Sequence, residues 1–481
     1  MRAPRILPAL CFADSEILRI FAMKKSTLNS LSIMEQMSWD RLINDKRFGL
    51  EHYHDPKTGS RSDFQRDFDR LVFSSPFRRL QNKTQVFPLP GSIFVHNRLT
   101  HSIEVASVGR SMAAEISMEL RKKYAAEPWV AKLDSIGEIV GAACLAHDLG
   151  NPPFGHSGEK AISTYFSEGE GRCFREQLTP RQWSDLTHFE GNANAFRLLT
   201  HRFNGRRPGG FAMTYSTLAS IVKYPFDSSL AGAHGKFGFF SSEQDDFVKV
   251  AGELGMIRLR ESGDAVRYAR HPLVYIVEAA DDICYEIMDI EDAHKLRILS
   301  TDEVIPLFLG YFDEARRGHI ERVMETVDDP NEKIAYLRSC IIGVLVNRCA
   351  EAFVCHEEEI LKGTFKGSLL DHIPALERKG YRDCEALSWK KIYCAGDVVD
   401  IELAGTRIIS FLIHELVKAV CNPELNYSRL LLAKVPEQYE VNSPGLYGKL
   451  QAVLDHISGM TDVYALDLYS RLKGMSLKIN N

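Results

Sequence analysis

The segment 136–146 (IGEIVGAACLA) constrains the fold more than any other part of the chain. Apart from one glutamate it contains only glycine and apolar residues. A helix that is apolar on every side has to be covered by other elements, because exposing it to water costs hydrophobic free energy. We therefore expect a helix here, at the centre of the molecule.

Other segments repeat apolar residues with the helical period. In 102–121 they fall near one stripe, and 272–289 begins with a proline, which helices favour in their first turn. The same period continues at 333–353, 399–420 and 446–459, and strand-like alternation is confined to short pieces near 237–240 and 247–268. We predict a predominantly all-α fold with minor short strands.

The composition is that of an ordinary globular protein. Hydrophobic residues make up 45% of the 481 residues and charged residues 26%, which excludes a disordered chain. The net charge of −5 is too small to imply a dedicated nucleic-acid or membrane-surface protein, and no apolar stretch is long enough for a membrane span. The ten cysteines form no CxxC pair and mostly lie in apolar helical patterns, so we expect reduced, buried thiols and a cytoplasmic protein.

We divide the chain into three regions. Residues 1–33 are predicted to be an N-terminal extension, either disordered or upstream of the true start of the protein. Residues 34–300 are predicted to form a helical core that holds the functional site. Residues 301–481 are predicted to form a helical C-terminal region that packs on the core and completes the site or an oligomer interface.

The strongest chemical signal is the pair His147-Asp148, which directly follows the apolar segment. A carboxylate beside an imidazole at the end of an apolar helix is costly unless a metal or another partner compensates it. The pair therefore suggests metal ligands. The alternative is a plain helix end, because Gly150 and the two prolines after it are good stop signals.

Two further residues extend this set. His101 opens the helix predicted at 102–121, and Asp281 lies in the middle of the helix predicted at 272–289, where an unpaired acid would be destabilising. Together with His147 and Asp148 they offer two imidazoles and two carboxylates. Such a set suits one divalent cation, such as Mn²⁺, Mg²⁺, Fe²⁺, Ni²⁺ or Zn²⁺.

The order His…His-Asp…Asp resembles the HD superfamily of metal-dependent phosphohydrolases, and the words around it resemble its deoxyguanosine triphosphate triphosphohydrolases (dGTPases). These words are LQNKTQVFPL at 80–89, NRLTHS at 97–102, HDLGNPPFGH at 147–156, FEGNA at 189–193, KYP at 223–225 and EAADDI at 278–283. The similarity runs from about residue 39 to about residue 293 and resumes at 457–462 (ISGMTD). It implies an HD-domain helical core over 34–300.

The resemblance implies that His101, His147, Asp148 and Asp281 bind one divalent metal ion, with Mn²⁺ or Mg²⁺ as the first choice. Asp282 is the rival of Asp281. Helical spacing supports Asp281, because it shares one helix face with residues 285 and 289, as a pocket wall requires.

The resemblance also implies that His156 and Glu159 are catalytic. Their i, i+3 spacing at the start of a helix lets the carboxylate orient the imidazole and raise its basicity. The alternative is a histidine that caps the helix and a first-turn glutamate that is favourable to the helix dipole.

Cations are required at such a site because a dNTP carries about four negative charges. By resemblance, Arg98 and Lys223 are expected near the triphosphate, with Tyr224 beside the lysine. Arg98 lies three residues before His101 and is the stronger candidate. For Lys223 a solvated surface lysine is the alternative.

The remaining substrate contacts are implied by resemblance alone. Gln85 and Val86 match positions that hold the sugar and base, Tyr285 matches a ring against the deoxyribose, and Asp289 matches a partner of the 3′-hydroxyl. A tyrosine packed where a 2′-hydroxyl would project can exclude ribonucleotides.

Asn192 and His188 also fall in or beside a matching word. An insertion before this word weakens its register. For these two residues and for Gln85, an ordinary polar role near a loop is the alternative.

The predicted reaction is hydrolysis of dGTP, with other dNTPs as further candidates, at the α-phosphate to give the deoxynucleoside and tripolyphosphate. The chain has no GxxxxGK[ST] motif and therefore no P-loop for γ-phosphoryl chemistry. Two alternatives stay open: an HD phosphodiesterase or 5′-nucleotidase, and a nucleotide- or single-stranded-DNA-binding module with an inert HD site. The resemblance also implies a homo-oligomer, hexamer or tetramer, with an activating dNTP or single-stranded DNA as further partners and no membrane partner.

Overall fold

The computed structural model describes residues 36–52, 60–87, 95–261 and 263–475. The predicted extension 1–33 and the last two residues of the word at 80–89 lie outside these ranges. Within them the regular secondary structure is helical apart from isolated β-bridges, which confirms the predicted all-α class.

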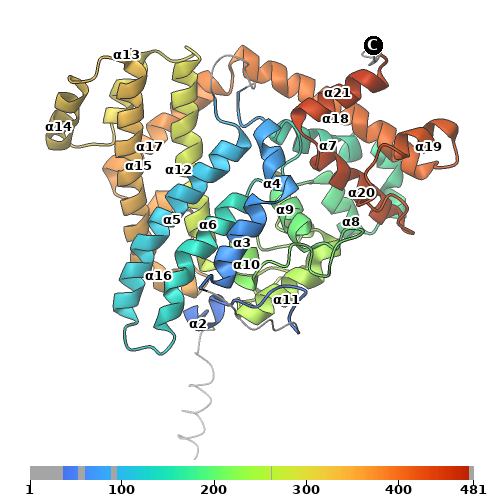
Figure 1. The fold of residues 1–481 in the computed structure, drawn as a ribbon, viewed down its shortest axis with the longest axis horizontal. Helices are drawn as coiled ribbons and strands as arrows, with labels where there is room; N and C mark the ends of the chain where they lie inside the picture. Colours follow the sequence, from blue (N-terminus) through green and yellow to red (C-terminus); the bar gives the residue numbers. More distant parts are fainter. Residues whose placement is uncertain (1–35, 53–59, 88–94, 262, 476–481) are drawn as a thin grey trace, which may run out of the picture.

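The α-helices follow one another along the described chain (Figure 1). The first half carries α2 (Trp39–Leu42), α3 (Asp63–Val72), α4 (Ser75–Arg79), α5 (Arg98–Lys123), α6 (Ile136–Ala146), α7 (His156–Ser167), α8 (Pro180–Thr187), α9 (Gly191–Thr200), α10 (Tyr215–Ile221) and α11 (Gln244–Leu254). The second half carries α12 (Pro272–Lys295), α13 (Thr301–Leu309), α14 (Glu314–Met324), α15 (Pro330–Cys355), α16 (Glu357–Leu361), α17 (Ala375–Leu387), α18 (Gly396–Cys421), α19 (Asn426–Leu432), α20 (Leu446–Ser458) and α21 (Asp462–Leu472). A π-helical turn, η8 (Ser388–Ile392), connects α17 to α18.

The apolar helix α6 lies at the centre, as predicted. Nine of its eleven residues are buried, and α3, α5, α10 and α12 pack around it. The approach of α5 is so close that a Cβ on Gly109 would lie 2.8 Å from the Cys144 Sγ. This packing brings the start of α5 and the middle of α12 to the end of α6, where His147 follows.

The predicted helices at 102–121 and 272–289 are each longer than expected. At the start of α5 the Asn97 side chain accepts hydrogen bonds from the backbone N–H groups of Leu99 and Thr100, and this cap begins the helix at Arg98. His101 is therefore the fourth residue of the helix, in its first turn. α12 continues to Lys295, six residues beyond the predicted end at residue 289.

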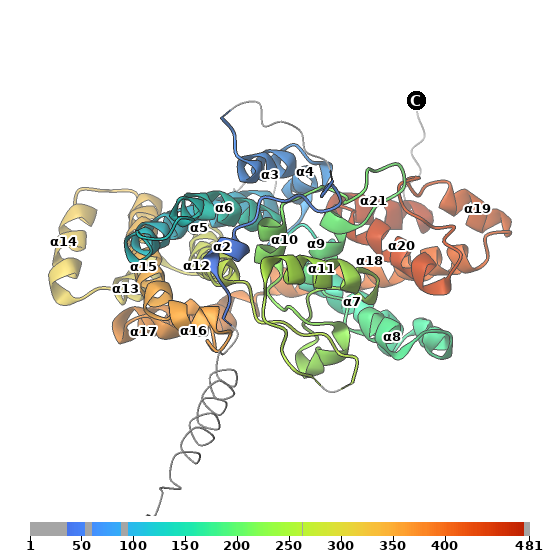
Figure 2. The same ribbon diagram turned by 90° about the horizontal axis from the view of Figure 1, so that it is seen from below.

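The molecule is elongated, with α13, α14 and α15 at one end and α19, α20 and α21 at the other (Figures 1 and 2). Two clusters of buried apolar side chains correspond to this shape. The larger cluster joins α5, α6 and α12 to α15, and the second joins α7 and α8 to α18, α20 and α21. Both clusters include residues from each side of position 300, and the division of the chain at that position stays a prediction.

The prediction of short strands near 247–268 is wrong for its first part. Phe247, Val250, Ala251 and Leu254 are buried on one face of α11, and this i, i+3, i+4, i+7 spacing is helical. Elsewhere in the described ranges the only β-contacts are isolated bridges, for example between Arg258 and Tyr268.

The prediction that the cysteine thiols are mostly buried holds for fewer than half of those described. The nine cysteines in the described ranges are all free. Those at 144, 284, 349 and 384 are buried, whereas those at 173, 355, 394 and 421 are exposed. Among the helices described, none is both long and apolar enough to cross a membrane.

Candidate active site

The start of α5, the end of α6 and the middle of α12 bring three of the four predicted metal ligands together. His101 Nε2 lies 3.0 Å from Asp281 Oδ1, and His147 Nε2 lies 3.4 Å from the same oxygen. The ligand atoms of the three residues all lie within 4.8 Å of one another. The structure thus places Asp281, rather than Asp282, against the two imidazoles.

The ring of His147 is oriented as a metal ligand would be. Its Nδ1 donates a hydrogen bond to the Cys144 carbonyl at 2.6 Å, which leaves the lone pair on Nε2. This Nε2 is buried and has no hydrogen-bond partner among the described residues. Two imidazoles and a carboxylate in this arrangement fit a divalent cation.

Electrostatics favour positive charge at the same position. Burial would lower the pKa of His147, but Asp148 and Asp281 outweigh burial and raise this pKa to about 9. Burial would also raise the pKa of Asp281, but His147 and His101 hold it well below its ordinary value. The carboxylates therefore stabilise a positive charge between the imidazoles, and a divalent ion would supply one.

Asp148, the fourth predicted ligand, stands beside this group. Its Oδ1 lies 3.7 Å from His147 Nε2, and its Oδ2 accepts a hydrogen bond from Arg98 Nη1 at 2.9 Å. Asn151 donates a further hydrogen bond to Oδ1. Asp148 thus holds Arg98 at the site, and the buried Arg98 Nε has no acceptor among the described residues.

His156 and Glu159 form a hydrogen-bonded pair at the start of α7. His156 Nδ1 lies 2.9 Å from Glu159 Oε2, while Oε1 accepts the backbone N–H of Gly191 at 2.8 Å. Burial would raise the pKa of Glu159, but His156 and Lys236 lower it, and the resulting anion raises the pKa of His156. A fixed carboxylate therefore orients an imidazole whose side chain is 77% exposed.

The turn before α7 explains why His156 lies close to Arg98. Phe154 and Gly155 have φ values of 62° and 56°, in the left-handed region that favours glycine. A Cβ on Gly155 would lie 2.5 Å from Arg98 Nη2, so the guanidinium needs glycine at this position. Phe154 tolerates its strained conformation because its N–H is held by Asp462 Oδ1 at 2.9 Å.

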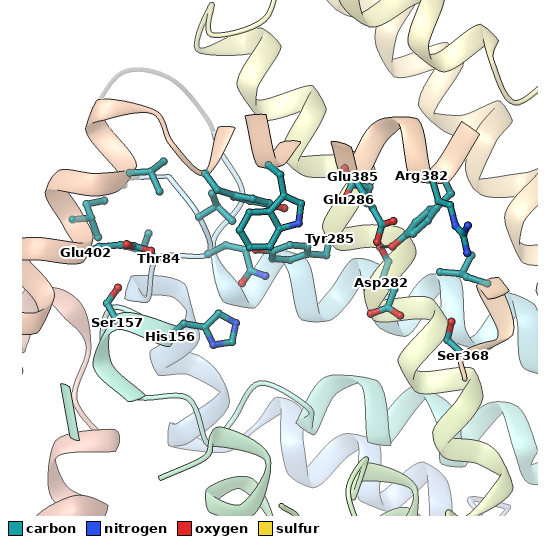
Figure 3. A pocket seen from close by; sticks show the side chains of 18 of the residues that line it. Thr84, His156, Ser157, Asp282, Tyr285, Glu286, Ser368, Arg382, Glu385 and Glu402 are labelled. Atoms are coloured by element: carbon teal, nitrogen blue, oxygen red, sulfur yellow. Dashed lines mark hydrogen bonds between the residues drawn. The ribbon is translucent and has the colours of Figure 1, made fainter. Parts of the chain in front are cut away.

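A cavity of about 630 Å³ lies beside the pair, within the size range of small-molecule sites. Its wall comes from residues 84–86, the start of α7, one face of α12 and the segment 368–402. Figure 3 shows His156 and Ser157 on one side of this cavity, while Asp282, Glu286 and Glu385 gather away from them.

Three of the predicted substrate contacts line this cavity: Gln85, Val86 and Tyr285. The Gln85 Oε1 is buried and has no hydrogen-bond donor within the described ranges. Asp289 lies behind the wall, where its Oδ2 accepts a hydrogen bond from the Tyr393 hydroxyl at 3.0 Å.

Lys223, Tyr224 and Asn192 do not line the cavity. The Lys223 Nζ lies 3.2 Å from Glu278 Oε1 and is held electrostatically by Asp282, which raises the pKa of this lysine despite its burial. Tyr224 packs beside Lys223. The Asn192 side chain donates to Glu190 Oε1 at 3.0 Å.

His188 lies at a different place. It ends α8, and its Nδ1 lies 3.1 Å from the Ser184 carbonyl, one turn earlier. Its side chain lines a separate open cavity together with Trp183. The matching word at 189–193 instead leads into α9. His188 belongs to the end of α8, and it does not line the cavity at His156.

The sequence analysis missed the C-terminal wall of the cavity. Side chains from α17, from the turn η8 and from the residue after it contribute to this wall: Arg378, Arg382, Trp389 and Tyr393. No spacing or motif marked them, because isolated aromatic and basic residues in helical segments are ordinary surface and core residues.

Asp462 ties the C-terminal helices to the site. Its Oδ2 accepts the Thr84 N–H at 2.7 Å, while its Oδ1 accepts the Phe154 N–H. Beside it, Lys83 donates to the carbonyls of Asn151 and Ser458. Burial lowers the pKa of Lys83 to about 7. These contacts hold the segment 84–86 and the turn before α7 to α20 and α21.

The chain matches two described families. Residues 98–223 match the HD domain, and residues 382–471 match the phosphohydrolase-associated domain. The first match contains His101, His147, Asp148, His156 and Glu159. The second contains Asp462 and one side of the cavity.

Relatives match over most of their length. A deoxyguanosinetriphosphate triphosphohydrolase-like protein of Pseudomonas aeruginosa is 37% identical over 92% of this chain and 99% of its own. A protein of the same description from a Synechocystis species is 36% identical over 92% of this chain and 100% of its own. A deoxyguanosinetriphosphate triphosphohydrolase of Yersinia enterocolitica is 31% identical over 85% of this chain and 93% of its own. The chain therefore belongs to the deoxyguanosinetriphosphate triphosphohydrolase family of HD-domain hydrolases.

Proposed function

We propose that this protein hydrolyses dGTP, with other dNTPs as further substrates, to the deoxynucleoside and tripolyphosphate. One observation carries the proposal: the Asp148–Arg98 ion pair connects the cluster of His101, His147 and Asp281 to His156, which pairs with Glu159 and lines a nucleotide-sized cavity. The names of the relatives support the choice of dGTP.

His101, His147 and Asp281, with Asp148 beside them, would hold one divalent ion, and Mn²⁺ or Mg²⁺ is our proposal for it. When bound, such an ion polarises a phosphoryl oxygen and lowers the pKa of water. The hydrogen bond from His147 Nδ1 to the Cys144 carbonyl supports this role, because it fixes the ring with Nε2 turned to the cluster.

His156 holds the proton that the departing 5′-oxygen of the deoxynucleoside requires. Its hydrogen bond to Glu159 raises the pKa of His156, so the ring is protonated at a higher pH than a free histidine. The Gly191 N–H and Lys236 keep Glu159 an anion through the step. Proton transfer of this kind contributes about 10²- to 10⁴-fold to a rate.

The substrate would lie with its phosphates toward Arg98 and its sugar against Tyr285. Arg98 offers a buried Nε without an acceptor in the described ranges, which a phosphate oxygen would satisfy. Gln85 offers an unpaired buried oxygen to a sugar hydroxyl. Asp289, which accepts a hydrogen bond from the cavity residue Tyr393, stays our proposed partner of the 3′-hydroxyl by resemblance. We keep Val86, Lys223, Tyr224, Asn192 and His188 as proposed substrate contacts from resemblance alone.

We further propose a cytoplasmic homo-oligomer, a hexamer or tetramer, that an activating dNTP or single-stranded DNA regulates. The free cysteines of the described chain support the compartment. Exposed apolar side chains on the outermost helices, Leu430 on α19 and Val463 on α21, support self-association.

The test is to incubate each dNTP separately with the protein and Mn²⁺ or Mg²⁺, and to separate the products by ion chromatography. We expect tripolyphosphate and the deoxynucleoside in equal amounts, and no tripolyphosphate from a His156→Ala variant. Orthophosphate or pyrophosphate as the sole phosphate product would instead support an HD phosphodiesterase or 5′-nucleotidase. Full activity of the variant would refute the proposed mechanism.

A further inference from the structure

Trp389 is the most exposed tryptophan in the described ranges. Its relative exposure is 69%, and it forms part of the cavity wall. Burying a tryptophan removes 150–250 Å² of largely apolar surface from water, so leaving it exposed forgoes that stabilisation. An exposed indole at a cavity therefore suggests a surface that a ligand covers.

The backbone around Trp389 is firmly held. Its neighbour Ser388 and Ile392 at the end of the same turn are both fully buried, and the Ser388 hydroxyl donates to Glu286 Oε1 at 2.6 Å. The turn η8 that carries them is π-helical, a conformation that recurs at functional sites. The exposure of Trp389 thus belongs to an anchored element and not to a frayed end.

An aromatic series connects Trp389 to the candidate metal site. The Trp389 ring meets the Tyr393 ring edge-on, with centroids 5.4 Å apart. Tyr393 in turn stacks against Tyr285, with centroids 6.2 Å apart and an interplanar angle of 27°. Tyr285 lies one turn of α12 after Asp281, so the series leads from the metal ligands along the cavity wall.

Trp389 and His156 line the same cavity, and the turn before His156 packs against Arg98. The indole nitrogen of Trp389 donates a hydrogen bond to none of the described residues, and its ring lies among the cavity-lining side chains. A nucleotide has phosphates at one end and a flat aromatic base at the other, so one bound in this cavity can place its phosphates near His156 and its base against the indole.

We propose that Trp389 is the stacking platform for the nucleobase of the substrate. The inference rests on the proposed function and deepens it, because it adds a base contact from the C-terminal region to the phosphate and sugar contacts. Stacking uses the face of a base, which every base has. Trp389 therefore sets the affinity for dNTPs in general and leaves the choice among them to other side chains.

The test compares three variants of the full-length protein with Mn²⁺. Trp389→Ala removes the platform, and Trp389→Phe retains an aromatic face. Leu403→Ala is the matched control, because Leu403 is 66% exposed on the neighbouring helix α18 and does not line the cavity. Steady-state kinetics with each dNTP, and inhibition by tripolyphosphate, give the readouts.

Base stacking is worth about 1–3 kcal/mol, which corresponds to about 5- to 150-fold in affinity. We expect Trp389→Ala to raise KM by such a factor for all four dNTPs, with kcat and the order of preference unchanged. Trp389→Phe should recover most of the loss, and Leu403→Ala should behave as wild type. The inhibition constant of tripolyphosphate, which has no base, should stay the same in every variant.

An unchanged KM in Trp389→Ala would overturn the inference, and so would an equal loss of tripolyphosphate binding. Sedimentation measures the oligomer mass of each variant. A change in this mass in both Trp389→Ala and Leu403→Ala would assign the indole to a contact between copies of the chain, and this result would also overturn the inference. If the wild type hydrolyses no dNTP, the proposed function fails. Quenching of tryptophan fluorescence by dNTPs, lost in Trp389→Phe, then decides the stacking inference separately.

Discussion

His147 uses its two ring nitrogens for different purposes. Nδ1 is committed to the Cys144 carbonyl of α6, and Nε2 is turned toward His101 and Asp281. The backbone of the central helix therefore fixes the tautomer of a candidate metal ligand. The central apolar helix thus directly orients a side chain of the candidate metal site.

At this scale the adjacent acids Asp281 and Asp282 make a sharp test. Loss of a residue that only supports a metal ligand weakens metal binding roughly 10- to 100-fold. We expect Asp281→Asn to weaken Mn²⁺ binding by more than this, because Asp281 approaches both imidazoles. Asp282→Asn should change the Mn²⁺ affinity far less, since Asp282 lies outside the cluster and its charge acts on Lys223. Isothermal titration with Mn²⁺ measures both; equal losses would contradict the assignment of Asp281.

The pair His156–Glu159 predicts a pH effect. Glu159 raises the pKa of His156, so the wild type keeps its proton donor to a higher pH. In Glu159→Gln this support is lost, the proton leaves at lower pH, and the alkaline limb of the kcat/KM profile should move to lower pH. We also expect kcat to fall about 10²- to 10⁴-fold. A profile that keeps its alkaline limb in place would show that Glu159 does not tune His156.

Between elements, His96 locks the start of α5 to α12. Its Nδ1 lies 2.8 Å from Asp292 Oδ2 on α12, and its Nε2 lies 3.1 Å from Glu104 Oε1 on α5. Burial would lower the pKa of His96, but the hydrogen bonds to Asp292 and Glu104 outweigh it and raise this pKa to about 10. The charged imidazole thus holds together the two helices that supply His101 and Asp281.

This lock predicts how stability depends on pH. The pKa of His96 is higher in the folded protein than in the unfolded chain, so its contribution is complete below about pH 6.5 and is lost as pH rises toward 10. Urea unfolding at pH 6.5 and at pH 9.5 should show a fall of a few kcal/mol in the wild type that is smaller in His96→Gln. Equal falls in the two proteins would contradict the lock.

Across the whole molecule, Asp462 connects the C-terminal helices to the turn before α7. Its two carboxylate oxygens accept from Thr84 and Phe154, and hydrogen bonds to charged groups are worth about 1.5–3 kcal/mol each. We expect Asp462→Ala to lower the free energy of unfolding by about 3 kcal/mol and to reduce kcat, because the turn positions His156. Asp467→Ala, which removes a surface acid of the same helix, is the control. Wild-type kcat in Asp462→Ala would refute the coupling.

The parts of the fold that follow from local sequence were predictable. The apolar run of α6 and the apolar stripes of α5 and α12 predicted three buried helices, and these helices carry His101, His147 and Asp281 to one place. The spacing of Asp281 and Tyr285 on one face favoured Asp281 over Asp282, and Asp281 is the acid that approaches the imidazoles.

The rest depends on contacts between distant segments. Trp389 on η8 and Tyr393 directly after it line the cavity, where η8 packs on α12. The hydrogen bond from Ser388 to Glu286 that joins the two elements spans 102 residues, and no local pattern predicts it. His188 was predicted as a substrate contact because it adjoins a matching sequence word. It ends α8, however, and its side chain lines a separate cavity. Tertiary packing decided these positions.

Hydrolysis of dGTP in ¹⁸O-labelled water with Mn²⁺ tests the central claim most directly. Attack of water at the α-phosphorus, with His156 supplying the proton to the departing 5′-oxygen, predicts one labelled oxygen in tripolyphosphate and none in deoxyguanosine. Label in orthophosphate or pyrophosphate, or in the 5′-hydroxyl of deoxyguanosine, would contradict the account.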